Sequence, residues 1–181
     1  RCVAEKGYSA TTIREIARAA GMTSGSLYHY FPTKAALLKA TLSTIEHTAM
    51  PRLRTAAQHG GDVVDRLDAV LDESDRLMRE YPHLAAFERA MRSERAAHLR
   101  GDDPDRVGFQ ALRDILDDVI ANAQLDGSLS AAADREAAVD VLDALARGLT
   151  EQAANLSAEA YHVTLTSAKK LIRGTLFHQG N

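Results

Sequence analysis

The chain has 181 residues, of which 45% are hydrophobic and 26% are charged, and its formal net charge is −3. A chain of this length buries a hydrophobic core without disulfides or metals, and the single cysteine, Cys2, excludes an internal disulfide. No apolar run approaches the roughly 20 residues that cross a bilayer, and no signal peptide is recognisable, so we expect a soluble cytoplasmic protein.

The first residues have the pattern of a helix that is already under way. Residues 2–6 read Cys-Val-Ala-Glu-Lys, and the chain opens on Arg1 without a methionine. We therefore expect that a segment which completes this helix precedes Arg1.

A helix-turn-helix is predicted next. Thr12 with Glu15 three residues later has the form of a capping box, which starts the first helix. Gly21 can adopt the positive φ that ends it, and the small Ala17, one turn earlier, allows a close helix crossing. Thr23 or Ser24 caps the second helix. Buried contacts between the two helices are expected from Ile13, Ile16, Ala20, Met22 and Leu27.

The second helix exposes short hydrogen-bonding groups and aromatic rings, a face that can enter a DNA major groove: Ser24, Gly25, Ser26, Tyr28, His29 and Tyr30. Gly25 weakens the helix by roughly 1 kcal/mol, which suits a close backbone approach to DNA; the alternative is a loose first turn. Arg14 can reach a guanine edge with two hydrogen bonds, or is simply a solvated charge. Tyr28 and Lys34 are placed for phosphates.

This pattern resembles the DNA-binding domain of the TetR family of transcriptional regulators. The resemblance rests on the run Leu-Tyr-His-Tyr-Phe-Pro-Thr-Lys at residues 27–34, together with residues 7–12, Ile16, Ala17 and Gly21. It implies that Thr12 and Arg14 approach DNA from one helix while Ser24, Gly25, Ser26 and His29 lie on the recognition helix. Tyr28, Tyr30 and Lys34 would hold the backbone, although the Tyr30 ring could instead pack with Phe31. Relatives often carry a lysine where this chain has Ser24.

Charge is divided unevenly along the chain. Residues 1–58 contain eight Lys or Arg and three Asp or Glu, a balance of +5, whereas residues 59–181 have a balance of −8. The basic part suits a polyanion, and the acidic part would stay off the duplex.

The sequence after Lys34 predicts helices only, without strand alternation or repeats. We expect an all-α fold, with a three-helix DNA-binding domain at 1–43 and a helical-bundle domain at 44–181. The first long helix runs from about Lys34 to Gln58, with Pro51 kinking it, breaking it or starting a new segment. The later helices are expected at about 62–80, 83–99, 105–125, 132–154 and 158–177.

The last two helices are candidates for dimerisation, because apolar and small residues cover more than one stripe of each; ordinary packing within one subunit is the alternative. The family resemblance implies a four-helix interface across a two-fold axis, so that a homodimer reads a palindromic site. The candidate interface residues are Val141, Leu145, Gly148, Leu149, Leu165, Ala168, Leu171 and Ile172.

The resemblance also implies an effector pocket among the central helices, although such residues are often plain core. Its candidate lining residues are Met50, Leu77, Met78, Phe87, Met91, Phe109, Leu112 and Leu116. The polar groups that could orient a ligand are His47, His83, Glu88, Arg92 and Tyr161.

The expected function is that of a ligand-responsive, DNA-binding repressor that works as a homodimer and is released from its operator by an unidentified small molecule. The spacing of histidines, carboxylates and glycines matches no metal, phosphate-loop or nucleophile motif, so no enzyme activity, cofactor or metal is expected. The alternatives are a helical adaptor or an enzyme that retains the fold without operator binding.

Overall fold

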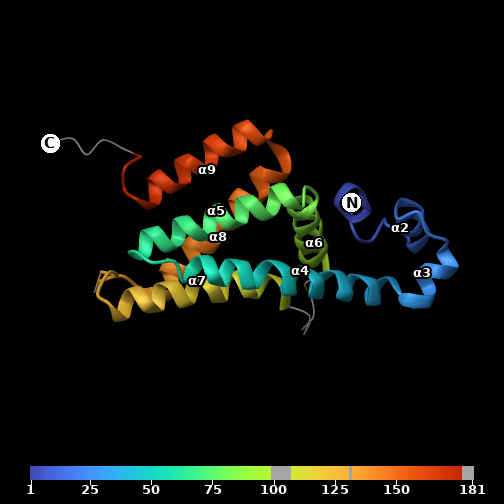
Figure 1. Cartoon of the computed structure of the whole chain (residues 1–181), viewed down its shortest axis with the longest axis horizontal. Coiled ribbons are helices and arrows are strands. Elements are labelled where there is room, and N and C mark those ends of the chain that lie inside the picture. Colours follow the sequence, from blue (N-terminus) through green and yellow to red (C-terminus); the bar gives the residue numbers. More distant parts are fainter. Residues whose placement is uncertain (99–106, 131, 177–181) are drawn as a thin grey trace.

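The computed structural model describes residues 1–98, 107–130 and 132–176, with their side chains except at 92–98 and 107–110. Within this part the regular elements are α-helices (Figure 1), as expected from the sequence. Their bounds are α1 Cys2–Lys6, α2 Ile13–Ala19, α3 Ser24–Tyr30, α4 Lys34–Ala57, α5 Val63–Glu80, α6 Leu84–His98, α7 Val107–Leu125, α8 Arg135–Asn155 and α9 Ala158–Ile172. None of the described helices is long and apolar enough to cross a membrane.

The N-terminal end of the molecule is a small head formed by α1, α2, α3 and the first turns of α4 (Figure 1). Its core consists of Ile13, Ala17 and Leu27, with the partly buried Ile16, Phe31 and Leu37 packed around them. Two residues that the sequence predicts to be buried are not. Ala20 and Met22 are exposed, because they flank the turn at Gly21 and their side chains lie outside the α2–α3 contact.

Helix α4 is continuous from the head into the rest of the molecule, here called the body. Of the outcomes considered for Pro51, a break or a new segment is wrong, because the helix passes through this residue. A proline removes one backbone hydrogen bond from a helix. Packing offsets that loss, since Met50 and Leu53 on either side are buried in a cluster with Val70 and Ile115.

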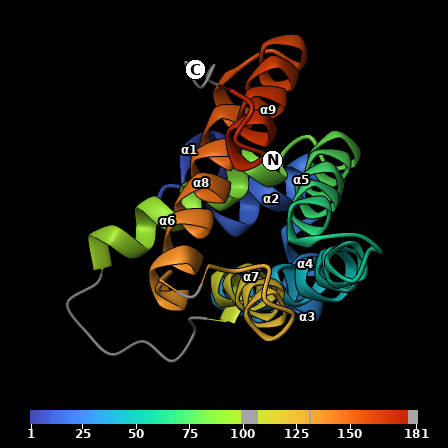
Figure 2. The ribbon, with the colours of Figure 1, turned by 90° about the vertical axis from the view of Figure 1, so that its left-hand side faces the viewer.

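The body arranges α5, α7, α8 and α9 around shared apolar residues (Figure 2). Helix α7 packs against α4, α5 and α8, and it supplies the fully buried Ile115 and Val119. Helix α9 lies on the outside and packs mainly against α5 and α8. The head meets the body through the continuous α4 and through contacts between α1 and α6.

The described helix ends lie within one residue of the expected ranges except at α8 and α9, and the expected limits at residues 99 and 105 lie outside the described residues. Helix α8 begins at Arg135, three residues later than expected, because the Asp134 side chain accepts the Ala137 N–H and caps it. Helix α9 ends at Ile172 and does not reach residue 177. Gly174 adopts a φ of 68° there and lets the next N–H bond back to the Lys170 carbonyl, which closes the helix.

Candidate functional site

The turn between α2 and α3 has the hydrogen bonds of a Schellman motif. Gly21 has a φ of 67°, its N–H donates to the Arg18 carbonyl, and the Met22 N–H donates to the Ala17 carbonyl at 2.9 Å. Ala17 is almost fully buried at the crossing point. The glycine and the small residue therefore set the direction in which α3 leaves α2, as the sequence predicts.

Helix α3 presents its polar face to solvent. The Thr23 hydroxyl accepts the Ser26 N–H at 3.1 Å and caps the helix, which decides between the two candidate caps. Leu27 faces the head core, whereas Gly25, Ser26, Tyr28 and His29 are exposed and Ser24 is half-buried. A short helix that is anchored by one leucine and bears hydroxyl, imidazole and backbone groups outward can make hydrogen bonds in a groove.

Tyr30 lies in solvent and does not pack under the head. Its side chain is 67% exposed, and its ring meets that of His29 edge to face at a centroid distance of 5.5 Å. The alternative packing with Phe31 is therefore wrong for this residue. Phe31 alone turns toward the head core.

Gly25 has room for a side chain. A Cβ atom at this position would find only the Thr23 Oγ1 atom near it, at 3.9 Å, and the backbone φ there does not demand glycine. The fold of the head therefore does not require glycine at this position. Both explanations considered for Gly25, a close approach to DNA and a loose first turn, stay predictions.

The start of α2 is held by an ion pair and a capping box. The Thr12 hydroxyl accepts the Glu15 N–H, while the Glu15 carboxylate accepts the Thr12 N–H at 2.8 Å and the Lys6 ammonium at 2.6 Å. The hydrogen bond from Lys6, followed by those from Thr12, lowers the pKa of Glu15 to about 2. Arg14 projects from this fixed helix start, is exposed, and forms no ion pair with a described residue.

Lys34 is placed differently from the expectation. Its ammonium group donates to the carbonyl oxygens of Tyr8 at 2.8 Å, Thr11 at 3.0 Å and Ser9 at 3.4 Å. An ammonium group has three protons, and all three are directed at these carbonyls. In this arrangement Lys34 holds the α1–α2 loop to the start of α4, and no proton is left for the expected phosphate contact.

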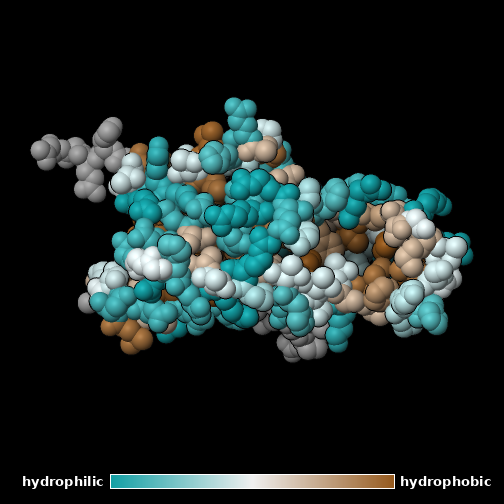
Figure 3. Space-filling model, in the orientation of Figure 1, coloured by the Kyte–Doolittle hydropathy of each residue, from teal (hydrophilic) through white to brown (hydrophobic). Residues whose placement is uncertain are grey.

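The expected dimer residues divide into three groups by burial. Leu149, Leu165 and Ala168 are buried inside the subunit with Tyr161, so they cannot form an outer surface without unfolding this cluster. Leu145 and Ile172 are partly buried against the interior. Val141, Gly148 and Leu171 are exposed, as is Val163 on α9. Apolar surface is visible over α9 in Figure 3.

The expected effector residues do not gather around one cavity. A cavity of about 20 Å³ lies between α5, α7, α8 and α9, and of the seven candidates whose side chains are described only Leu112 and Leu116 line it. Met50 and Leu77 are buried in the cluster next to α4, and Met78 packs beside Leu149 and Tyr161. Phe87 and Met91 are buried in α6, and the side chain of Phe109 lies outside the described residues.

Among the candidate polar groups whose side chains are described, only Tyr161 lines the cavity. His47 and His83 are exposed and Glu88 is half-buried, while the Arg92 side chain lies outside the described residues. Sequence reasoning missed Ser74, a second hydroxyl at the cavity. A signal for it exists, since Ser74 follows Leu67, Val70 and Leu71 at helical spacing and so shares their apolar face. Within the described residues, no three His, Cys, Asp or Glu side chains cluster as metal ligands.

The head matches a known sequence family. Residues 1–41 match the family model of bacterial regulatory proteins of the tetR family. Over 122 residues the chain is 32% identical to the HTH-type transcriptional repressor KstR of Mycolicibacterium smegmatis, an alignment that covers 67% of this chain and 56% of the relative. The chain thus spans only about half the length of this curated relative.

The whole fold is also found in solved structures. The chain superposes on the regulator FadR from Bacillus subtilis in complex with stearoyl-CoA with a TM-score of 0.72 and 17% identity, covering 98% of this chain and 94% of that one. It superposes on the ketosteroid transcriptional regulator KstR2 of Mycobacterium tuberculosis with a TM-score of 0.69 and 21% identity, covering 95% and 88%. At these identities the likeness concerns the fold.

Proposed function

Because the chain belongs to the TetR family of bacterial regulatory proteins, we propose that it is a ligand-responsive DNA-binding transcriptional regulator. It acts as a homodimeric repressor that a small-molecule effector releases from a palindromic operator. The observation that carries this proposal is the polar outer face of α3, held on the head by the buried Leu27 and by the turn at Gly21.

The proposed DNA surface combines α3 with the start of α2. Ser24, Gly25, Ser26 and His29 enter the major groove, and Arg14 reads a base edge beside them. Tyr28 and Tyr30 contact phosphates of the DNA backbone, and Thr12 lies close to the same backbone. Lys34 contributes by holding the loop that precedes Thr12. The net charge of +5 in residues 1–58 supports this placement, because the phosphate backbone attracts a basic surface.

The proposed dimer uses the outer faces of α8 and α9. Ala137, Val141, Ala144 and Gly148 recur at helical spacing and are exposed, and a side chain at Gly148 would meet no atom within 4 Å. Such a row of small residues allows a second helix to approach closely. Two copies joined here present two α3 helices to successive major grooves, which requires a site with two-fold symmetry.

The proposed switch couples the body to the head by two routes, the continuous α4 and the contact between α1 and α6. Two packings of the body would hold the two α3 helices at different separations, and the effector favours the one that does not fit the operator. Coupling is reciprocal, so DNA weakens effector binding by the same factor, commonly about 1–3 kcal/mol in free energy.

We assign residues 1–43 to DNA binding and 44–181 to effector binding and dimerisation, with no catalytic step. We place the protein in the cytoplasm with its DNA.

A small-molecule effector with a large apolar part is favoured, because one structural neighbour is bound to stearoyl-CoA and another is a ketosteroid regulator. The aliphatic lining of the cavity agrees with such a ligand.

The test is selection of bound fragments from the source genome, followed by fluorescence anisotropy with the enriched sequence. We expect saturable binding that exceeds binding to a scrambled duplex by at least about a thousandfold. The enriched sequence should contain two inverted half-sites. Equal affinity for all sequences would contradict the proposal of a specific regulator.

A further inference from the structure

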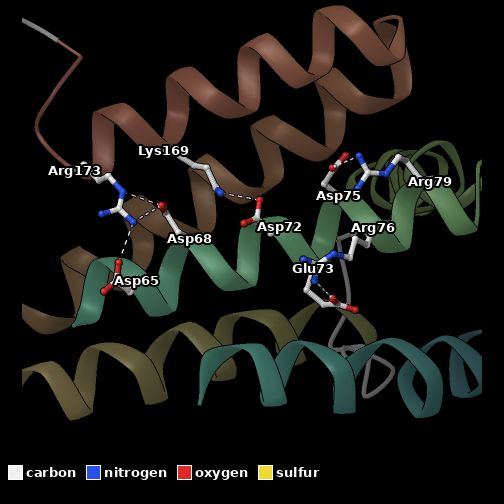
Figure 4. Close-up of polar contacts among 9 residues, drawn as sticks. All are labelled: Asp65, Asp68, Asp72, Glu73, Asp75, Arg76, Arg79, Lys169 and Arg173. Atoms are coloured by element: carbon white, nitrogen blue, oxygen red, sulfur yellow. Dashed lines mark hydrogen bonds and ion pairs between the residues drawn. The ribbon is translucent and has the colours of Figure 1, made fainter. Parts of the chain in front are cut away.

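Helix α5 lies between the helix that carries the head and the outermost helix of the body. It packs against α4 on one side and against α9 on the other (Figure 4). Under the proposed function, α4 carries the DNA-binding surface and α9 carries part of the dimer surface. The orientation of α5 toward each of these helices therefore affects where the recognition helix α3 lies relative to the partner subunit.

Ion pairs join α5 to α9 at two successive helical turns. Lys169 donates to Asp72 at 2.7 Å, and Arg173 donates to Asp68 at 2.6 Å and to Asp65 at 3.0 Å (Figure 4). The two cations are four residues apart on α9, and the carboxylates that they bind are three or four residues apart on α5, so each row lies on one helix face. Contacts at two turns fix both the position of α9 along α5 and its rotation about its own axis.

A second set of ion pairs joins α5 to α4. Arg52 donates through Nε to Glu73 at 2.6 Å and through Nη1 to Glu80 at 2.6 Å. Glu73 is mostly buried and also accepts from Arg76 at 2.8 Å. Because successive residues of a helix project about 100° apart, Glu73 faces α4 while its neighbour Asp72 faces α9 (Figure 4). The two sets of pairs are thus adjacent on α5.

Stability does not explain the pairs between α5 and α9. They are partly exposed, and such pairs contribute little to the free energy of unfolding. The Oδ1 atom of Asp68 is moreover buried without a hydrogen-bond partner, which is unfavourable. The apolar contacts nearby, of the cluster around Leu165 with Leu71 and Met78, are non-directional, whereas charge-assisted hydrogen bonds have a specific geometry. The ion pairs are therefore suited to select one orientation of α9.

A small change of orientation in the body moves the head by a large distance. Helix α4 is continuous, and its segment between Arg52 and Lys34 spans about 27 Å at about 1.5 Å per residue. A tilt of about 7° at Arg52 then displaces the head by about 3.3 Å, close to the rise of about 3.4 Å between base pairs. In a dimer with two-fold symmetry both heads move, so the separation of the two α3 helices changes by up to about twice this displacement.

We propose that Arg52, Lys169 and Arg173 are positioning residues that determine which spacing between operator half-sites the dimer accepts. They act through the orientation of α4 and α9 toward α5 and need no contact with DNA. This inference rests on the proposed homodimeric DNA-binding function, and it assigns the spacing specificity of that function to ion pairs within one subunit.

The first experiment measures spacing preference with the full chain. Fluorescence anisotropy gives its affinity for the operator selected from the source genome, for duplexes with one or two base pairs inserted or deleted between the half-sites, and for an isolated half-site. The affinity for the selected spacing divided by that for the best altered spacing is here called the spacing ratio, and it should be at least about ten for the unmodified chain. In Lys169→Met combined with Arg173→Gln, and in Arg52→Met, this ratio should fall at least about threefold, with half-site affinity unchanged.

The second experiment separates orientation from stability by reversing one pair. Lys169→Glu alone places two carboxylates together and should reduce the spacing ratio, whereas Lys169→Glu combined with Asp72→Lys forms an ion pair of opposite polarity and should restore the ratio. Arg135→Gln is the matched control, because it removes a similarly exposed ion pair, with Asp117, that joins α8 to α7 and does not involve α5. Its spacing ratio should equal that of the unmodified chain.

The contrary outcomes are distinct. A spacing ratio that stays unchanged in either the Lys169 and Arg173 variant or Arg52→Met overturns the assignment of the residues replaced, and so does a charge reversal that fails to restore the ratio. A loss of half-site affinity equal to the loss for the whole operator also overturns the inference, because the pairs then serve only the stability of the fold. If the unmodified chain has no specific DNA binding, the proposed function is wrong; if it binds specifically and all variants keep its spacing ratio, only the assignment of positioning residues is wrong.

Discussion

The ammonium group of Lys34 lies 4.2 Å from the centre of the Tyr8 ring and donates a hydrogen bond to the Tyr8 carbonyl oxygen at 2.8 Å. The start of α4 is thereby fastened to the loop that follows α1. Since α1 also contacts α6 of the body, and α4 runs into the body, both routes between body and head meet at this contact.

Replacement of Lys34 by methionine should weaken binding to every DNA sequence without changing the salt dependence. The loss of a cation–π contact and of charge-assisted hydrogen bonds should lower the free energy of unfolding by about 1–2 kcal/mol. Anisotropy titrations over a range of salt concentrations provide the measurement, with the exposed Lys39→Met as control. A salt slope reduced by about one unit would instead show that Lys34 contacts a phosphate.

Arg14→Ala should relax sequence preference more than it weakens DNA binding overall. Arg14 is exposed beside α3 and has no ion pair with a described residue, so its guanidinium is free to bond a guanine edge, worth about 1–3 kcal/mol of discrimination. Affinities for the operator and for single-base variants provide the measurement, and Arg18→Ala on the same helix is the control. An equal loss for all sequences would assign Arg14 to the backbone.

Gly25→Ala should separate folding from DNA binding. The added methyl group meets no atom of the head closer than 3.9 Å, and alanine favours the helix, so the free energy of unfolding should stay the same or rise by up to about 1 kcal/mol. Operator affinity should fall, because the methyl group occupies space needed by DNA. Chemical denaturation and anisotropy are compared on one sample, and undiminished affinity would leave Gly25 as a loose first turn.

Acid should destabilise the head through Glu15. Its pKa is lowered from 4.5 to about 2 in the folded chain, so the stabilisation is fully present above about pH 4.5 and is lost as pH falls toward 2. Melting temperatures of the unmodified chain and of Glu15→Gln should therefore differ most at neutral pH and converge on acidification. A difference that stays constant down to pH 2 would remove Glu15 as its cause.

Val141→Glu should dissociate the proposed dimer. The side chain of Val141 is 67% exposed on the outer face of α8, so a glutamate there is tolerated by the subunit but is buried without a partner in a dimer. Sedimentation velocity should show at least about a tenfold weaker association. Leu125→Glu, at an even more exposed leucine on α7, is the control and should sediment as the unmodified chain does.

Local patterns were sufficient to predict the head. The capping box of Thr12 and Glu15, the turn at Gly21 and the buried Ala17 and Leu27 all depend on residues within one or two helical turns of each other. The same logic predicted most helix ends in the body. In the head it was wrong at Ala20 and Met22, whose side chains lie beyond the contact between α2 and α3.

Sites in the body could not be predicted in the same way. Apolar residues such as Met50, Leu149 and Leu165 have the same local pattern whether they line a pocket, form an interface or fill a core. The partners that distinguish these cases come from helices far apart in the chain. Asp68 and Arg173, for example, are brought together only when α9 folds back onto α5.

The sequence by itself determined the helical class, the position of the helix-turn-helix and the residues offered on its outer face, because the backbone hydrogen bonds and side-chain periodicity that specify them act over a few residues. Only the tertiary structure decided that Lys34 bonds to the α1–α2 loop, that Lys169 and Arg173 form ion pairs with α5 (Figure 4), and which faces of α8 and α9 stay exposed. These features depend on which residues far apart in the chain come into contact in the fold. Local sequence patterns do not specify such contacts.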